Sequence, residues 1–242
     1  MSESNANRVD DPVNQAGSFT PTDRTRLRRR PKRGSYDRAV IHAILDEAVL
    51  AHVAFTVAGV PYTLPMAYAR HGDALYLHGA RANRMLGALQ TGAPACVTAT
   101  LLDGLVLARS AFHQSVSYRC VVAIGRASEV TDPGEHLRAL HAIVEHVIPG
   151  RWRDVRPPNE HELAQTLVLR FEIEEASAKL RDGAPVDDPE DYALDVWAGT
   201  IPLRLVPSAP IADARLTSDA KPPAYALEYR RPGAREGKRS AQ

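Results

Sequence analysis

The stretch that decides the fold is residues 95–130, which read ACVTATLLDGLVLARSAFHQSVSYRCVVAIGRASEV. It consists of apolar runs broken by short polar links. Asp103-Gly104 stands between two of these runs, and this dipeptide is typical of a two-residue β-hairpin. We therefore expect strands over Ala95–Leu102 and Leu105–Phe112, followed by a third over Ser117–Val130.

Apolar runs of strand length continue on both sides of this stretch. Further strands are expected at Val49–Val57, Val60–Arg70, Ala74–His78 and Thr166–Glu174. Helical periodicity is confined to residues 37–48, residues 81–90 and the segment that Asp132-Pro133 opens. Many short strands with few helices indicate a mainly β (α+β) domain, built as an antiparallel barrel or sandwich.

Two of the expected helices allow more detailed predictions. Ser35 is in position to cap the first helix. The last helix should bury a stripe formed by Leu137, Leu140, Val144 and Val147. On the same helix His136, His141 and His146 recur every five residues, which spreads them around it. We therefore expect no metal site there.

The composition argues against several classes of protein. The chain has 242 residues and a formal net charge of +1, which is too small a positive field for a general nucleic-acid binder. Cys96 and Cys120 lie in apolar runs and are interpreted as buried thiols of a reducing compartment. No apolar run approaches the roughly 20 residues of a membrane helix, and the N-terminus does not resemble a secretory signal. We expect a cytoplasmic protein without nucleic-acid or membrane partners.

Three parts follow one another along the chain. Residues 1–33 lack hydrophobic periodicity and are expected to form a disordered or loosely packed basic arm. The arm ends in RRRPKR, residues 28–33. This run either binds phosphate or nucleic acid, or packs its arginine stems on the domain, and its shortness favours the second interpretation. Residues 34–205 form the folded domain, and residues 206–242 a flexible proline-rich tail.

The segment LHGARANR, residues 77–84, suits phosphate binding. A strand ends at the glycine and a helix begins, so free N–H groups and two arginines are available to an anion. An ordinary strand-to-helix turn with solvent-facing arginines is the alternative.

Two further segments carry candidate residues. Prolines in PYTLPM, residues 61–66, indicate an edge strand or a place where a ligand meets the backbone. In RSAFH, residues 109–113, strand alternation puts Arg109 and His113 on one face with Leu105 and Leu107. Polar groups on such a face need partners or a ligand. A satisfied core histidine with a surface arginine is the alternative.

An ordered set of short motifs points to one family. The motifs are RGSYDR (33–38), LYLHG (75–79), TATLLDGLVLARSAFH (98–113), SYR (117–119), SAK (177–179) and VWAG (196–199). Taken together over residues 33–205, they resemble the FMN-binding proteins related to pyridoxamine 5'-phosphate oxidase, and most nearly the nitroimidazole-resistance (Nim-like) reductases.

That resemblance implies a six-stranded antiparallel split β-barrel with Greek-key character and a few flanking helices. It also implies a homodimer with FMN at the subunit interface. The residues implied to line the flavin ring are Thr63, Leu64, Pro65, Met66 and Trp197. Those implied to hold the phosphate are His78, Gly79, Ala80, Asn83 and Arg84. Those implied to lie beside the cofactor are Arg109, His113, Tyr118 and Arg119. Relatives commonly have serine where this chain has Ala80, so one hydroxyl contact to phosphate is lost.

The function implied by the resemblance is an FMN-dependent oxidoreductase. Its substrate would be a small planar acceptor such as a nitro-heterocycle or a quinone. His113 would be the catalytic group, because a histidine can orient a substrate or relay a proton near neutral pH. A non-enzymatic FMN protein for storage or redox sensing is one alternative. A haem-binding split barrel, with His113 or His78 as the axial ligand, is the other.

Overall fold

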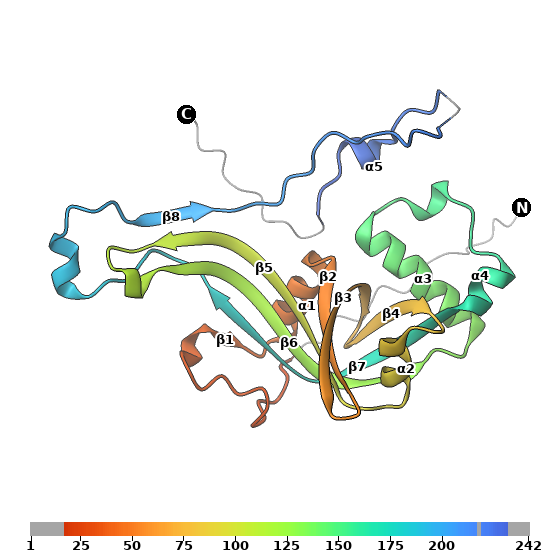
Figure 1. Ribbon diagram of the computed structural model, residues 1–242, viewed down its shortest axis with the longest axis horizontal. Helices are drawn as coiled ribbons and strands as arrows, with labels where there is room; N and C mark the ends of the chain where they lie inside the picture. The colour runs from red at the N-terminus through yellow and green to blue at the C-terminus, as the bar shows by residue number, and fades with distance from the viewer. Residues whose placement is uncertain (1–16, 217–218, 232–242) are drawn as a thin grey trace, which may run out of the picture.

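A computed structural model describes residues 17–216 and 219–231 of the chain. Six antiparallel strands close into a barrel in the order β7-β4-β3-β2-β5-β6, and the pairing of β6 with β7 completes the ring (Figure 1). They are β2 (Leu50–Val57), β3 (Val60–His71), β4 (Ala74–Ala80), β5 (Ala95–Leu107), β6 (Ser115–Glu129) and β7 (Thr166–Arg181). The prediction of a six-stranded antiparallel barrel is confirmed. Two short strands extend it: β1 (Gly34–Ser35) pairs with β7, and β8 (Gly199–Pro202) pairs with β5.

Helices close the barrel and cover one side of it. They are α1 (Arg38–Glu47), α2 (Arg84–Gln90), α3 (Pro133–Val147), α4 (Glu160–Gln165) and α5 (Ala224–Leu227). Single 3-10 turns lie at η1 (Pro31–Arg33), η2 (Ala111–His113), η3 (Trp152–Asp154) and η4 (Pro189–Ala193). The cap of α1 is Asp37 and not Ser35, because the Asp37 carboxylate accepts from the N–H groups of Ala39 and Val40 at 2.7 and 3.2 Å.

The main core fills the barrel. Alternate residues of each strand point inward and form it, such as the fully buried Leu167, Leu169 and Phe171 of β7. A second, smaller apolar cluster lies between the sheet and α3. Its members are Ala69, Tyr76, Val130, Ala139, Ile143 and Val168.

The buried face of α3 differs from the predicted stripe. Ala139 and Ile143 are its buried residues, whereas Leu137 is 38% exposed. The Tyr76 hydroxyl donates to Glu135 at 2.8 Å in the first turn of the helix, so Glu135 anchors the helix to the sheet. The small Ala139 side chain then faces the sheet, where it permits close approach.

The predicted hairpin at Asp103-Gly104 is wrong. β5 continues through this dipeptide with only a bulge against β6. A side chain at Gly104 would come within 2.9 Å of the Ile201 carbonyl of β8, so glycine serves close strand approach here and not a turn. The chain reverses instead at η2, where the Gln114 amide bonds both the N–H and the carbonyl of Ala108. Arg109 and His113 therefore do not share a strand face as predicted.

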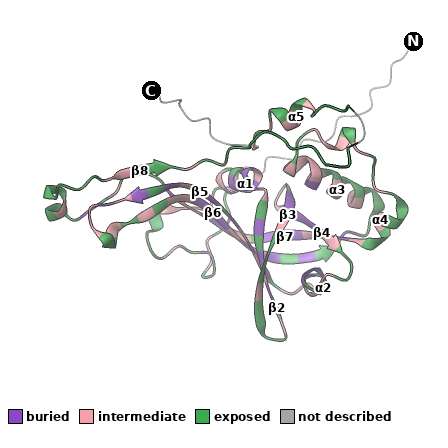
Figure 2. Cartoon of the chain, turned by 45° about the horizontal axis from the view of Figure 1, so that its top comes forward, coloured by how far each residue is buried: buried purple, intermediate pink, exposed green. Residues whose placement is uncertain are grey.

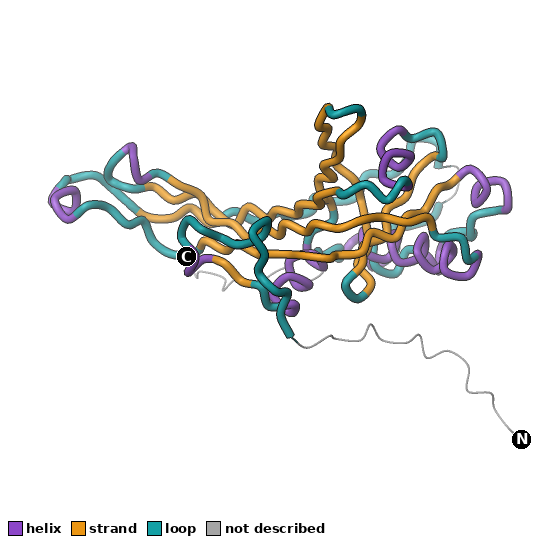
Figure 3. Tube along the Cα trace, turned by 90° about the horizontal axis from the view of Figure 1, so that it is seen from below, coloured by secondary structure: helices purple, strands orange, loops and turns teal. Residues whose placement is uncertain are grey.

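This late reversal creates a long ribbon that leaves the barrel (Figures 1 and 3). We call Leu102–Leu107 of β5, Ser115–Tyr118 of β6 and the strand β8 the ribbon. Figure 3 shows it as a strand arm on the side away from most of the helices. Its residues are mostly exposed or half-buried, while buried residues concentrate in the barrel (Figure 2).

The chain outside the predicted domain makes contacts with it where it is described. Phe19 is only 4% exposed and belongs to the main core. Near the other end, the Tyr229 hydroxyl donates to the Val147 carbonyl at 2.9 Å, and Arg151 donates to the Tyr225 hydroxyl at 2.9 Å. Residues 1–16 of the predicted arm, and 217–218 and 232–242 of the predicted tail, lie outside the described residues.

Two further findings concern the cysteines and the helices. Cys96 and Cys120 are free thiols, and both are half-buried, whereas the sequence predicted buried thiols. Among the described residues, every helix is too short or too polar to cross a lipid bilayer.

Candidate functional site

A cavity of about 450 Å³ opens between the described part of the arm and the tip of the ribbon. We call it the basic cavity. Strand β1 holds the arm in place, because Gly34 pairs with Lys179 of β7. The cationic residues of its wall are Arg29, Arg30, Arg33, Lys179 and Arg181. His113 and Phe112 at the tip of the ribbon complete the wall that faces the arm.

Arg29, Arg30 and Arg33 of the basic run thus lie against the domain at a cavity, as the second interpretation expects, and binding of phosphate or nucleic acid by the run stays a prediction. Within residues 17–216 and 219–231, none of the five cations that line the cavity forms an ion pair with a carboxylate. Arg181 is buried and donates to the Val116 carbonyl at 3.1 Å. Burial, followed by the charges of Arg33 and Arg30, lowers the pKa of Arg181.

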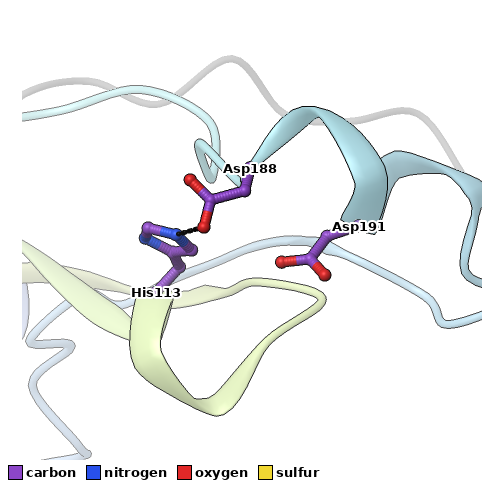
Figure 4. Close-up of side chains that lie close together, drawn as sticks. All are labelled: His113, Asp188 and Asp191. Carbon is purple, nitrogen blue, oxygen red and sulfur yellow. Dashed lines mark ion pairs between the residues drawn. The ribbon is translucent and has the colours of Figure 1, made fainter.

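His113 lies at the rim of this cavity beside two carboxylates. Its Nε2 is 3.3 Å from an oxygen of Asp188, and Asp191 approaches from the same turn, η4 (Figure 4). The three side chains offer ligand atoms within 4.8 Å of one another. This arrangement can move a proton between imidazole and carboxylate, and it could also hold a cation. The Phe112 ring meets the imidazole edge-on at 5.1 Å.

Arg109 and Arg119 make structural contacts. Arg109 pairs with the fully buried carboxylate of Asp187 at 3.2 Å, and its guanidinium lies 4.9 Å from the centre of the Tyr192 ring. Arg119 binds two carboxylates, those of Glu47 and Asp103, through both sides of its guanidinium. These arginines therefore hold loops and strands together.

Tyr118, the neighbour of Arg119, is half-buried on the outer face of β6. It lies opposite Leu102 of β5 and Arg181 of β7, at the base of the ribbon. That position is close to the basic cavity through Arg181.

The turn at residues 78–84 is largely satisfied by internal contacts. The Asn83 side chain caps α2 by accepting from the N–H groups of Met85 and Leu86 at 2.9 and 3.2 Å. The guanidinium of Arg84 lies 4.1 Å from the centre of the Tyr62 ring. Arg81 pairs with Glu129 at 3.0 Å. The phosphate role of His78, Gly79, Ala80, Asn83 and Arg84 stays a prediction.

The predicted ring-lining strand faces outward from the barrel. Register pairs Pro65 with His52 and Thr63 with Ala54, so these residues share the outer face of β2 and β3. Leu64 and Met66 point to the other face, and Leu64 is still 44% exposed because the hairpin extends beyond the barrel. From Val60 to Ala67, β3 pairs only with β2, so its other edge is open, as the prolines predict.

His78 is a separate feature, on the outer face of β4. Its Nδ1 is buried without a hydrogen-bond partner among the described residues, and burial lowers its pKa. His136 of α3 has a buried Nε2 in the same condition, and burial followed by the charge of Arg81 lowers its pKa. The sequence carries no signal for the burial of His136, because the five-residue spacing of His136, His141 and His146 places each on a different face of the helix.

Trp197 lies in a segment that follows η4 and leads into β8. It is 67% exposed, and other large apolar side chains around it are also exposed. They are Tyr192, Leu194, Val196 and Ile201. A single chain does not bury this segment.

A closed six-stranded antiparallel barrel with an open outer face and a projecting ribbon defines the split-barrel class of ligand-binding domains. The chain belongs to the pyridoxamine 5'-phosphate oxidase family, whose model matches residues 37–180. No curated protein sequence matches the chain.

Several solved structures are similar to this chain. The flavocytochrome Anf3 from Azotobacter vinelandii is 40% identical, with a TM-score of 0.82 over 88% of this chain and 99% of that one. The FAD- and haem-binding protein from Mycobacterium smegmatis is 36% identical, with a TM-score of 0.76 over 80% of this chain and 95% of that one. A putative 5-nitroimidazole antibiotic resistance protein from Bacteroides thetaiotaomicron is 23% identical, with a TM-score of 0.52 over 60% of this chain and 85% of that one; it shares the fold.

Proposed function

We propose that this chain is a redox protein that binds a flavin and a haem. The observation that carries the proposal is the buried, unpartnered Nδ1 of His78 beside an apolar cluster. Two similar proteins support it by name, one as a flavocytochrome and one as an FAD- and haem-binding protein. The proposal keeps the flavin implied by the sequence and adds the haem that was an alternative there.

The flavin ring would lie on the open outer face of β2, β3 and β5. Thr63 and Pro65 lie on this face, and His52 connects them in register to Thr98 of β5. The free edge of β3 offers backbone groups to the polar edge of a flat heterocycle. FMN is the form implied by the family resemblance.

His78 would bind the haem iron. A histidine that serves as an axial ligand must be neutral and must keep one ring nitrogen free of other partners. Burial favours the neutral imidazole of His78, and its Nδ1 has no competing hydrogen bond among the described residues. His113 fits this role less well, because its Nε2 faces Asp188. His136, whose buried Nε2 also has no hydrogen-bond partner among the described residues, would be the second candidate to hold the haem.

The chemistry divides between the bound groups and the chain. A flavin supplies one- and two-electron chemistry, and a haem supplies one-electron chemistry. The chain would bind and orient both, with the apolar cluster of Tyr76, Val168 and α3 beside His78, which pairs with Val168 in the sheet. His113 would serve as the proton relay to a small planar acceptor, such as a nitro-heterocycle or a quinone, with Asp188 as its neighbouring base.

We also propose a homodimer in which the exposed ribbon and the Trp197 segment cover the flavin face of the partner. Large apolar side chains are exposed on all of these surfaces. Leu50 of β2 is 54% exposed, Leu102 of the ribbon is 51% exposed and Trp197 is 67% exposed. Exposed apolar surface of this kind marks an interaction site. A flavin held between subunits would then stabilise the dimer.

The absorbance spectrum of the purified full-length protein tests the function. We expect flavin bands together with a Soret band, and a pyridine haemochrome assay should give up to one haem per chain. His78→Ala should abolish the Soret band. His161→Ala is the matched control, since His161 is an exposed histidine on α4.

Three results would contradict the proposal. Wild-type protein that shows no Soret band, even after haem is added, does not bind haem. Equal haem content in wild type and His78→Ala assigns the ligand to another residue. Protein without flavin bands that also fails to quench added FMN or FAD fluorescence rules out the flavin.

A further inference from the structure

The basic cavity is lined by five cationic side chains and three carboxylates, Asp182, Asp187 and Asp188, so positive charge is in excess. Arg29, Arg30 and Arg33 come from the arm, and Lys179 and Arg181 come from β7. Two of these carboxylates, Asp187 and Asp188, have partners of their own, and the third, Asp182, is exposed. Asp187 is occupied by Arg109 and by the N–H groups of Arg109 and Ser110, and Asp188 faces His113.

This arrangement is unfavourable for an empty cavity. Like charges around one space repel each other, and the positive charges of Arg33 and Arg30 contribute to lowering the pKa of the buried Arg181. Arg30 also adopts a left-handed backbone conformation with a φ of 57°, which non-glycine residues rarely adopt. Strain of this kind concentrates at sites that hold ligands. An anion with more than one negative charge would relieve the repulsion.

The shape of the cavity suits a nucleotide. Its volume of about 450 Å³ lies within the range of small-molecule sites, roughly 300–1,000 Å³. Phe112 lines the cavity and is 88% exposed, and Val186 beside it is 71% exposed. An exposed aromatic ring next to a group of cations offers a stacking surface for a base while arginines bind the phosphates.

The cavity is separate from the phosphate turn predicted at residues 78–84. Gly79 pairs with Leu167 near the start of β7, whereas the cavity begins at Lys179 near its end. At about 3.3 Å per strand residue, the two points lie up to about 40 Å apart along β7. A phosphate turn and a basic cavity of the same chain therefore do not hold the two ends of one FMN molecule.

We propose that the basic cavity binds the diphosphate of an adenine dinucleotide, with its phosphates on Arg29, Arg33 and Lys179 and its adenine against Phe112. Such a dinucleotide has two possible sources. It is either FAD bound as the flavin, in which case the inference deepens the proposed function, or a nicotinamide dinucleotide that serves as electron donor.

Isothermal titration calorimetry on the purified full-length protein tests the cavity, with ADP as the probe. The variants are Arg33→Ala and the double variant Arg29→Ala/Arg33→Ala. Lys32→Ala is the matched control, because Lys32 belongs to the same run and carries the same charge but does not line the cavity. The flavin that copurifies with each protein is released by acid and identified as FMN or FAD by chromatography.

Either of two results supports the inference. Protein that copurifies with FAD, together with an Arg33→Ala variant that holds FAD at least about tenfold more weakly but FMN equally well, assigns the cavity to the flavin. Protein that keeps its flavin and still binds ADP and NADPH, with at least about a tenfold loss in Arg33→Ala and none in Lys32→Ala, assigns it to a donor. Phe112→Ala should weaken the same ligand without changing the far-ultraviolet circular dichroism spectrum.

Two other results would overturn it. In the first, ADP does not bind saturably and FAD occupancy is the same in wild type and in Arg29→Ala/Arg33→Ala. In the second, Lys32→Ala and Arg33→Ala weaken binding equally, which indicates general electrostatic attraction and no defined site. These outcomes are independent of the haem test, since His78 lies outside the cavity.

Discussion

The barrel and the ribbon are built from the same two strands but follow different physical rules. Within the barrel, β5 and β6 bury alternate side chains, as with Val97, Ala99, Val121 and Ala123, which are fully buried. In the ribbon the same strands expose Leu102, Leu105 and Val116 (Figure 2). Burial alone specifies the barrel. The ribbon has little core of its own.

Two glycine-to-alanine substitutions, one in the barrel and one in the ribbon, offer the strongest test of this contrast. Gly125 lies at the irregularity between β6 and β7 in the barrel, and a Cβ there would overlap the Glu172 carbonyl. We expect Gly125→Ala to cost more than about 4 kcal/mol in the free energy of unfolding, because two paired barrel strands would have to separate. Gly104→Ala in the ribbon meets the Ile201 carbonyl of β8 and should cost about 1–3 kcal/mol. Urea denaturation followed by circular dichroism measures both, and equal costs would break the comparison.

The ion pairs of Arg119 join the two regions. Arg119 and Glu47 are both buried, at 8% and 6% exposure. Glu47→Gln should destabilise the chain by about 3 kcal/mol, because it leaves part of a buried guanidinium charge uncompensated. The control is Glu174→Gln, which breaks an exposed pair with Arg126 and should cost less than about 1 kcal/mol. A small effect of Glu47→Gln in thermal or urea unfolding would mean that the network does not hold α1 to the ribbon.

Trp197 tests whether the ribbon region needs a partner. If the exposed Trp197 anchors a dimer, Trp197→Ala should weaken dimerisation by about 2 kcal/mol, a factor of roughly 30 in the dissociation constant. Sedimentation equilibrium at several protein concentrations, with and without flavin, gives this constant. Leu205→Ala removes another exposed apolar side chain further along the chain and serves as control. A wild-type protein that is monomeric under all conditions would contradict the prediction.

The smallest expected effect is a pH dependence of the free energy of unfolding that comes from two histidines of the barrel region, His78 and His136. Burial lowers the pKa of His78 and of His136 below the ordinary value of 6.5. The unfolded chain therefore binds protons more readily, so the stabilising contribution is fully present above pH 6.5 and is lost as pH falls through the lowered pKa values. His78→Gln should reduce this loss by up to about 1 kcal/mol between pH 7 and pH 5. His161→Ala should leave the pH profile of the urea midpoint unchanged, and an unchanged profile in His78→Gln would argue against the burial effect.

Much of the fold was predictable because it rests on local periodicity. β7 shows strict alternation at Leu167, Leu169 and Phe171, and all three are buried as predicted. α2 ends as its glycine predicts, and α3 begins at Asp132 and Pro133. The continuation of β5 through Asp103-Gly104 was not predictable. Gly104 leaves room for the backbone of β8, and a glycine with this role looks the same in the sequence as a glycine in a turn.

The candidate site was less predictable, because its members come from distant parts of the chain. His113 was singled out from the sequence, but Asp188 and Asp191 joined it only through the folding of η4. The arginines of residues 28–33 appeared to be a solvated arm, and β1 brings them to Lys179 and Arg181. Arg109 and Arg119 were candidates for a ligand, yet each found a carboxylate from elsewhere in the chain.

The sequence by itself determined an antiparallel barrel or sandwich with most of its strands and helices, because alternation and capping act over a few residues, and its ordered motifs indicated the family and with it the barrel. Only the tertiary structure decided which charges are paired and which remain free. A guanidinium is neutralised or left for a ligand according to what lies within about 4 Å of it, and that neighbourhood is set by strand register and by long-range packing. Arg119 and Arg33 have the same guanidinium group. Packing places two carboxylates beside Arg119 and an open cavity beside Arg33.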